Sequence, residues 1–457
     1  MVEVPVKIYI QNISKKAREV AKLTALLSSV LKDKALRAMA DKLAEAEEKI
    51  LEANREDTET VGKALQAGDM RKDLVREAVD RLRLTADSIK EMADGLRRVA
   101  DLPDPVGEVT RMWQRPNGME VSRVRVPIGV IGIVSELDPK VMVESFALCL
   151  KSGNVCIFRG APEWIRTNTV IVTALREAAE GAGVPAGALT FVERSEKEGA
   201  LELMRLHTLL DAFIPRGGPG LRKTALDQVR VPVLCHESGV STVYVDVDVD
   251  LPMAQNLVIN AKLQQPSASN SVDTLLVQQA TARPLLPALI RRLIEEFKVD
   301  ILGCPKTVAL IGSQAMTGHK SVEPIKEEDW SRQFQSNTLA VKMVTDMDEA
   351  LAHIARYGPA HTCAIATRDY ATAMRFAREV DAAAVLINAS TRLHDGEEFG
   401  LGGQIGLATG RVHARGPIGL EALTCPKYVV LGTGQLRQPH PVPETYEDAI
   451  MLRKGLA

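Results

Sequence analysis

The sequence predicts an α/β protein with more than one domain, and three observations carry this prediction. The chain has 457 residues, which is too long for one simple core and suits two or three domains. Short apolar runs alternate with amphipathic stretches over residues 126–245, and a second alternating region extends to about residue 419. Apolar strands joined by helical crossovers indicate open parallel sheets with helices on both faces. Ligands of such sheets bind beyond the carboxyl ends of the strands.

Composition and charge exclude several classes of function. The 57 basic and 59 acidic residues give a net charge of −2, so neither a nucleic-acid surface nor a polybasic membrane patch is indicated. The longest apolar run, near residues 126–134, falls short of a membrane span, and the N-terminus lacks the layout of a signal peptide. We therefore expect a cytoplasmic protein. The six cysteines have neither metal-ligand nor redox spacing, so we expect neither a metal site nor a disulfide framework.

The first hundred residues are expected to be helical. Apolar residues recur at helical spacing over residues 12–65, and a second helical stretch covers residues 72–99. Residues 109–114 and 119–126 then flank Asn117-Gly118, a pair that accepts positive φ and predicts a β-hairpin. Within the first alternating region, the predicted strands include residues 128–134, 155–159, 188–192 and 209–215.

The stretch Pro215-Arg216-Gly217-Gly218-Pro219-Gly220 leaves a predicted strand and opens a predicted helix. Glycines let backbone amides approach an anion, and the helix N-terminus favours negative charge. The sequence here is compatible with a phosphate site and also with an ordinary strand-to-helix turn.

Residues 258–276 are the most informative stretch of the chain. Helical signals continue to Leu263, Pro266 ends them, and small polar residues at 267–271 precede an apolar run at 275–277. The sequence NAKLQQPSASNSVDTLL resembles, without a gap, the nucleophile loop N-A-K-x-Q-R-P-G-x-C-N-A-x-E-T-L-L of the gamma-glutamyl phosphate reductase family. That family, also called glutamate-5-semialdehyde dehydrogenase, belongs to the aldehyde dehydrogenase superfamily. The alignment puts Ser269 where the family has its cysteine.

Further segments resemble this family in the same order along the chain. They include R-Y-G-x-x-H at residues 356–361, N-A-S-T-R at 388–392, E-F-G-L-G-x-x-I-G at 398–406 and H-A-R-G-P-x-G at 413–419. The resemblance implies an aldehyde-dehydrogenase-like fold with a Rossmann-type cofactor domain (residues 1–106 and 127–240) and an α/β catalytic domain (241–425). It also implies an oligomerisation hairpin (107–126) and a C-terminal oligomerisation segment (426–457), hence a homo-oligomer, a dimer or a tetramer.

The resemblance also implies roles for individual residues. It places Ser269 and Asn270 at the catalytic position. It implies cofactor contacts, with NADPH, from residues at two strand ends, namely Arg159, Gly160, Arg216, Gly217 and Gly218. It implies substrate contacts from four polar or cationic residues, namely Asn260, Arg392, His413 and Arg415.

Two strand ends depart from the family pattern. After Arg159-Gly160 the family continues Gly-Ser-Glu-Ala, whereas this chain has Ala161-Pro162, and Pro162 removes an amide donor. The family's Tyr-Glu-Ser-Arg-Pro is Ser-Glu-Leu-Asp-Pro here, so Asp138 replaces an arginine and would repel an anionic substrate.

The resemblance implies NADPH-dependent reduction of gamma-glutamyl phosphate to glutamate 5-semialdehyde in proline biosynthesis. In the family a cysteine thiolate attacks the acyl phosphate, and the thioester then accepts hydride. A serine ionises far less readily than a thiol, so we expect impaired activity. Two alternatives stay open. One is a non-catalytic member that binds nucleotide or a partner enzyme such as glutamate kinase. The other is a serine-based hydrolase in which His236 or His413 serves as the base.

Overall fold

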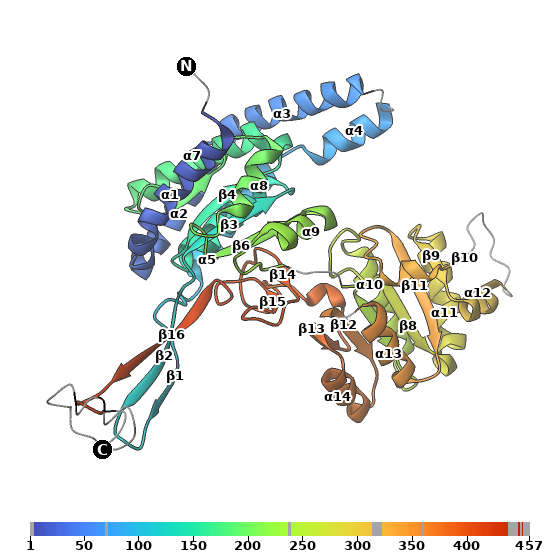
Figure 1. Ribbon diagram of the computed structural model, residues 1–457. Helices are drawn as coiled ribbons and strands as arrows, with labels where there is room; N and C mark the ends of the chain where they lie inside the picture. The colour runs from blue at the N-terminus through green and yellow to red at the C-terminus, as the bar shows by residue number, and fades with distance from the viewer. Residues whose placement is uncertain are drawn as a thin grey trace. The chain divides into compact units, whose positions relative to one another are not determined.

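The computed structural model describes residues 4–68, 72–235, 239–312, 322–358 and 360–436, and positions 447 and 450 (Figure 1). The chain divides into two compact units. Unit 1 comprises Met1–Asp104 and Pro127–Cys425, and unit 2 comprises Pro105–Val126 and Pro426–Ala457. No helix in the described ranges is both long and apolar enough to cross a membrane.

Unit 1 contains a four-stranded parallel sheet with the order β5-β4-β3-β6. Its strands are β3 (Val130–Ser135), β4 (Val155–Arg159), β5 (Leu189–Phe191) and β6 (Ala212–Arg216). The chain runs from β3 outward to β5 and then returns to the other side of β3. Strand order therefore reverses between β3 and β6, and the crevice beyond such a reversal is the usual ligand site of open α/β sheets.

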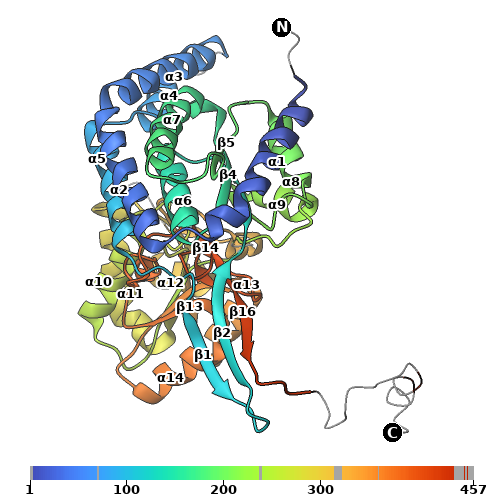
Figure 2. The same ribbon diagram turned by 90° about the vertical axis from the view of Figure 1, so that its left-hand side faces the viewer.

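Helices cover both faces of this sheet, as the sequence predicts. Alternate residues of β3 enter different cores: Ile131 and Ile133 pack on one face, and Val130 and Val134 on the other. Figure 2 shows α6 and α7 on one side of β4 and β5, and α1 and α8 on the opposite side. These helices are α1 (Val6–Ala25), α6 (Pro139–Lys151), α7 (Ile165–Gly181) and α8 (Lys197–Arg205), and α9 (Pro219–Gln228) follows β6.

The predicted N-terminal helical stretches are each divided by breaks. Residues 12–65 lie in α1, α2 (Ser29–Glu45) and α3 (Glu47–Ala67), and residues 72–99 lie in α4 (Lys72–Arg81) and α5 (Ala86–Asp101). The side chain of Ser28 caps α2 by accepting from the Leu31 amide (3.3 Å). Thr85 and Ser88 form a capping box at the start of α5.

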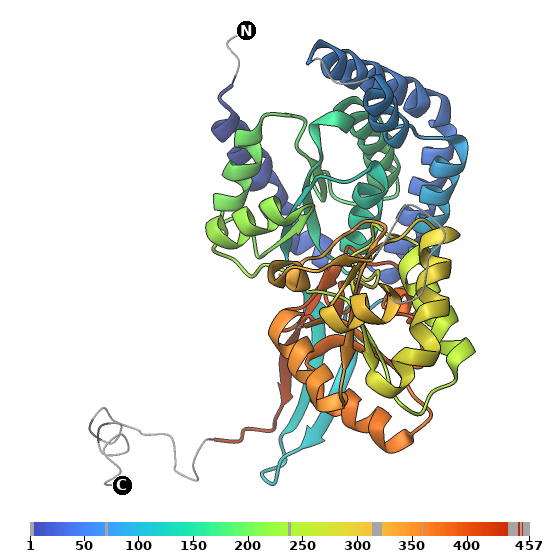
Figure 3. The same cartoon turned by 90° about the vertical axis from the view of Figure 1, so that its right-hand side faces the viewer.

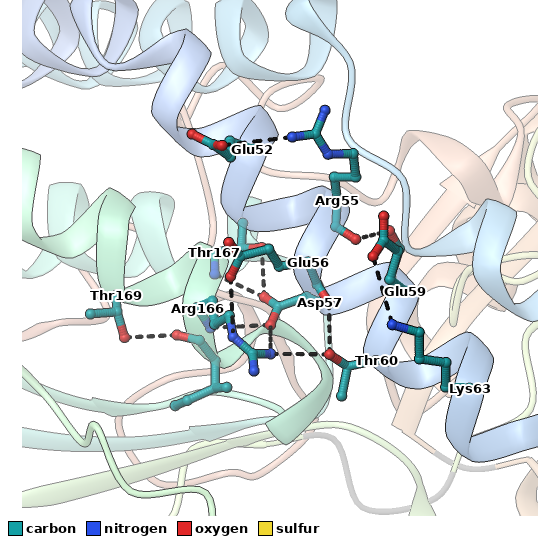
Figure 4. A network of polar contacts seen from close by, with 12 residues as sticks. Glu52, Arg55, Glu56, Asp57, Glu59, Thr60, Lys63, Arg166, Thr167 and Thr169 are labelled. Carbon is teal, nitrogen blue, oxygen red and sulfur yellow. Dashed lines mark hydrogen bonds and ion pairs between the residues drawn. The ribbon is translucent and has the colours of Figure 1, made fainter.

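A buried carboxylate joins α3 to α7 (Figure 4). Asp57 is 3% exposed and accepts hydrogen bonds from the amide and the hydroxyl of Thr167, both at 2.8 Å. Arg166 pairs with the other oxygen of the same carboxylate at 3.3 Å. Because α7 has no side-chain cap of its own, Asp57 provides the acceptor that the first turn of α7 needs.

The second sheet of unit 1 has seven parallel strands in the order β10-β9-β11-β8-β7-β12-β13. Its strands are β7 (Thr242–Val245), β8 (Thr274–Gln278), β9 (Asp300–Gly303), β10 (Glu323–Pro324), β11 (Thr338–Val344), β12 (Ala360–Ala366) and β13 (Ala382–Ile387). The yellow helices α10 (Leu251–Leu263) and α11 (Gln279–Glu295) cover one face, and the orange helices α13 (Met347–Tyr357) and α14 (Tyr370–Glu379) cover the other (Figure 3). α12 (Pro305–Gly312) follows β9.

Residues after β13 return to the core of the first sheet. Ile405, Ile418 and Leu423 are buried in the same cluster as Phe146 of α6. This segment carries the short strands β14 (Leu407–Ala408) and β15 (Gly416–Pro417). It thereby places the glycine-rich residues 400–406 against the helices of the first sheet.

Unit 2 is built on a three-stranded sheet in the order β1-β2-β16. The predicted hairpin is confirmed, because β1 (Val109–Gln114) and β2 (Glu120–Pro127) pair antiparallel and Gly118 has φ 85°. β16 (Thr424–Leu431) completes this sheet, and its Tyr428 ring lies 6.3 Å from that of Trp113. The assignment of domain functions stays a prediction.

Candidate active site

Residues 264–273 connect α10 to β8, and residues 264–271 of this connection are called here the Ser269 loop. α10 ends at Leu263, as predicted, and β8 begins at Thr274. The Ser269 carbonyl accepts from Ser241 Oγ (3.0 Å) and from Gln333 Nε2 (3.2 Å). The Ser269 side chain is partly buried, and within the described part of the chain its hydroxyl makes no hydrogen bond. The loop therefore presents an oxygen that is held in place through its backbone.

Arg392 and Asn270 lie together at this loop. The Arg392 guanidinium donates to Gln264 Oε1 (2.7 Å), to Gln265 Oε1 (3.1 Å) and to Asn270 Oδ1. Asn270, which is 3% exposed, donates through Nδ2 to the His394 carbonyl at 3.0 Å. Burial lowers the pKa of Arg392. The structure thus brings together three residues that the sequence singles out: Ser269, Asn270 and Arg392.

A buried lysine and aspartate lie behind the loop. Lys262 Nζ donates to the Val272 carbonyl (2.9 Å), and Asp273 accepts from the amides of Ser241 (3.1 Å) and Phe334 (3.0 Å). Burial lowers the pKa of Lys262 to about 8 and raises that of Asp273 to about 6, and each partly offsets the shift of the other. The sequence interpretation omitted both residues, although Lys262 belongs to the Asn-Ala-Lys motif.

The other predicted substrate contacts lie apart from this group. Asn260 is exposed on α10. His413 is also exposed, and its Nε2 lies 3.1 Å from the Ala422 carbonyl oxygen. Arg415 donates to Asp381 at 2.6 Å, and this pairing lowers the pKa of Asp381. In the described ranges neither a hydrogen bond nor an ion pair joins these three residues to Asn270 or Arg392, so their substrate roles stay predictions.

Glu136 occupies the glycine turn that follows β6. Its Oε2 accepts from the Gly218 amide at 2.8 Å, and a Cβ at position 217 would collide with the same carboxylate. Glycine at position 217 therefore lets the Glu136 carboxylate approach the turn closely. A phosphate on the Gly218 amide does not fit while Glu136 lies there, since two anions would compete for one donor.

Arg159 at the end of β4 offers a different possibility. The side chain is 6% exposed, its terminal nitrogen donates to the Ser195 carbonyl (2.9 Å), and its Nε has no partner among the described residues. A buried Nε–H without an acceptor fits an anionic or hydroxyl-bearing ligand. Gly160 is explained by packing, because a Cβ there would lie 2.5 Å from Asn168 Nδ2.

A cavity of about 260 Å³ lies among α5, α6, the end of β6 and residues 395–404. Its charged lining residues are Glu91, Arg98, Lys140, Glu144, Arg216, Asp395 and Glu397. Glu144 accepts from the Gln404 amide (3.1 Å), and burial raises the pKa of its carboxyl to about 7. Burial lowers the pKa of Arg216, whose Nε is buried without a partner in the described ranges. The sequence predicts Arg216 as a cofactor contact, which stays a prediction, and it assigns no role to Glu144.

Asp138, the charge reversal noted in the sequence, has a local structural role. It is the N-cap of α6 and accepts from the Lys140 amide at 3.0 Å. Its carboxylate therefore stabilises the start of the helix that carries Lys140 and Glu144.

The arrangement gives little support to a serine hydrolase. His413 contacts Ala422, and His361 lies 3.5 Å from Ser241 Oγ. His236 lies outside the described residues. All six cysteines are free thiols in the described part of the chain, and none belongs to the Ser269 loop. Ser269 thus has neither a histidine base nor a neighbouring thiol within its loop.

Comparison with known proteins gives a consistent result. The model of the aldehyde dehydrogenase family matches residues 7–308. The chain is 43% identical over 433 residues to the gamma-glutamyl phosphate reductase of Thermodesulfovibrio yellowstonii, covering 95% of this chain and 100% of that protein. It is 45% identical over 435 residues to that of Moorella thermoacetica, with 95% and 100% coverage. The crystal structure of gamma-glutamyl phosphate reductase from Thermotoga maritima matches with a TM-score of 0.87 and 39% identity, over 94% of this chain and 100% of that one. The chain therefore belongs to the gamma-glutamyl phosphate reductase family of the aldehyde dehydrogenase superfamily.

Proposed function

We propose that this protein reduces gamma-glutamyl phosphate to glutamate 5-semialdehyde, a step of proline biosynthesis, at a rate limited by Ser269. The observation that carries the proposal is the identity of 43–46% with gamma-glutamyl phosphate reductases over 93–95% of the chain. The contacts between Ser269's neighbour Asn270 and Arg392 support it, because they hold the residue at the reacting position in one place.

The limit on the rate follows from oxygen chemistry. A thiol has a pKa near 8.5, whereas a serine hydroxyl ionises about 5 units higher, which is on the order of 7 kcal/mol of nucleophile activation. An adjacent base can recover part of this cost, but the Ser269 hydroxyl has no hydrogen bond within the described ranges. An oxyester is also a poorer hydride acceptor than a thioester. We therefore expect slow turnover.

Members of the aldehyde dehydrogenase family use a nicotinamide dinucleotide, and we propose NADPH for this chain. When bound, NADPH supplies the hydride. Arg159 is the residue whose surroundings best fit it, because its buried Nε lacks an acceptor among the described residues. Glu136 would accept a hydrogen bond from a ribose hydroxyl, whereas its negative charge would repel a phosphate. The reaction is proposed to take place in the cytoplasm.

The cavity beside Glu144 suits the amino-acid end of the substrate. A glutamyl group carries one ammonium and one carboxylate. Glu144 and Asp395 offer acceptors for the ammonium, and Lys140 and Arg216 offer donors for the carboxylate. Arg216 supports this role most directly because its Nε is buried and unpaired in the described ranges.

The test is phosphate-dependent oxidation of glutamate 5-semialdehyde with NADP as acceptor. We expect slow turnover by the natural chain and a raised KM for the semialdehyde in Glu144→Gln, because one charge partner of the ammonium is lost. Glu180→Gln, an exposed carboxylate on α7, is the matched control. No turnover by the natural chain or by Ser269→Cys would contradict the proposal.

A second candidate function is a non-catalytic subunit that binds nucleotide or a partner enzyme such as glutamate kinase. The lack of a hydrogen-bonded base at Ser269 favours it. Tryptophan fluorescence during NADPH titration separates the two: tight binding without turnover, also in Ser269→Cys, supports the non-catalytic function.

A further inference from the structure

We infer that Arg392 is a positioning residue that fixes the Ser269 loop, rather than the anchor for a substrate carboxylate or phosphate. The inference rests on the proposed function only in taking residue 269 as the reacting position. It concerns how the chain's own side chains hold that position.

The Arg392 guanidinium bridges the two ends of the loop. Its Nε and one terminal nitrogen donate to Gln264 Oε1 (2.7 Å) and Gln265 Oε1 (3.1 Å), where the loop begins. Its other terminal nitrogen donates to Asn270 Oδ1, one residue after Ser269. All three guanidinium nitrogens therefore already have partners within the loop, and the planar geometry of the group fixes their directions.

The loop holds Arg392 in return. Asn270 Nδ2 donates to the carbonyl oxygens of His394 (3.0 Å) and Arg392 (3.5 Å). Both ends of the Asn270 amide are thus bound to η3 (Thr391–Leu393) and its C-cap. Because Asn270 is 3% exposed, breaking this contact would leave a buried amide without partners.

An anchor for an anion would need free N–H groups that point toward the substrate. Three of the five guanidinium N–H groups of Arg392 already bind the loop, including one on each terminal nitrogen. An anion could therefore bind only the two remaining N–H groups, unless it displaced Gln264, Gln265 or Asn270 and so removed a support of the loop. The guanidinium also places a positive charge in contact with the neighbour of residue 269. A nearby cation favours the thiolate form of a cysteine at that position.

The test uses Ser269→Cys as a reporter and requires no substrate. The rate of iodoacetamide alkylation of Cys at position 269 is measured against pH, and peptide mapping separates this thiol from the six native cysteines. Arg392→Gln and Arg392→Lys are made in this background, and Arg378→Gln, an exposed arginine of α14, is the control. Hydrogen exchange of the peptide covering residues 264–271 is the second readout.

We expect Arg392→Gln to move the alkylation pH profile upward by about one unit, a tenfold loss of thiolate at a pH below both pKa values. Arg392→Lys should keep most of the effect of the positive charge on the alkylation profile. Hydrogen exchange in the loop should nevertheless be faster in this variant, because a lysine cannot bridge both ends of the loop. Arg378→Gln should change neither readout.

An unchanged alkylation profile and unchanged loop exchange in Arg392→Gln would overturn the inference. A raised KM for glutamate semialdehyde together with those unchanged readouts would restore the anchor role. If Arg392→Gln fails to fold, as judged by thermal unfolding, loop exchange in Arg392→Lys decides. Because both readouts are independent of turnover, an inactive enzyme would contradict the proposed function without affecting this test.

Discussion

At the scale of single residues, protonation of Glu144 makes the stability of the folded protein depend on pH. Burial raises the pKa of its carboxyl to about 7 from an ordinary value of 4.5. The folded state therefore holds a proton that the unfolded state has lost between these two values. The stabilising effect of this proton is fully present below pH 4.5 and is lost as the pH rises through about 7.

Glu144→Gln should consequently raise the melting temperature at pH 8 and leave it nearly unchanged at pH 4.5. The substituted side-chain amide keeps an oxygen that accepts from the backbone N–H of Gln404, and it carries no charge that burial disfavours. Melting temperatures at the two pH values check this, with Glu180→Gln as the exposed control. Equal changes in melting temperature at both pH values would contradict a raised pKa of Glu144 in the folded state.

Some residues of the candidate site could be predicted from the sequence, and others could not. Ser269, Asn270 and Arg392 were predictable because motif resemblance identifies their positions, and the structure brings them together. Glu136 and Glu144 were not, because their partners Gly218 and Gln404 lie far away along the chain. Burial and partners from other segments decide what such carboxylates do, and no local pattern encodes them.

At the scale of elements, the junction of α3 and α7 depends on Asp57 (Figure 4). Asp57→Asn should lower the free energy of unfolding by about 1–3 kcal/mol, because one oxygen that accepts from Thr167 or Arg166 becomes an N–H donor. Urea denaturation measures the change. Glu59→Gln, an exposed carboxylate of α3 whose pairing with Lys63 is 4.0 Å long, should change stability by less than about 0.5 kcal/mol. Equal effects of the two substitutions would contradict a capping role for Asp57.

Capping residues did not by themselves make element boundaries predictable, because Ser28 and Thr85 cap helices that the predicted stretches did not separate. Residues 155–159 were predicted as a strand, and β4 has these bounds. The break between α2 and α3 at Ala46 was missed because neither helix has a side-chain cap there that a sequence pattern could reveal. Tertiary packing decides that break.

At the scale of the whole molecule, we propose that unit 2 associates with another copy of the chain. Relatives in this superfamily are typically oligomeric, and unit 2 exposes Met112 (57%) on β1 and Tyr428 (58%) on β16, the two outer strands of its sheet. Met112→Glu should shift the mass in size-exclusion chromatography with light scattering toward the monomer, because it places a charge on an apolar contact surface. Leu26→Glu, an equally drastic change at an 82% exposed position of unit 1, should leave the mass unchanged. A monomeric natural chain would contradict this proposal.

We propose that this gamma-glutamyl phosphate reductase scaffold carries an oxygen in place of sulfur at its reacting position. The most direct measurement is kcat for phosphate-dependent oxidation of glutamate 5-semialdehyde by the natural chain, Ser269→Cys and Ser269→Ala. We expect Ser269→Cys to raise kcat on the order of 100-fold or more, and Ser269→Ala to abolish turnover, because a thiolate forms and leaves far more readily than an alkoxide. If the natural chain and Ser269→Ala turn over equally, and Ser269→Cys brings no gain, residue 269 is not the reacting centre.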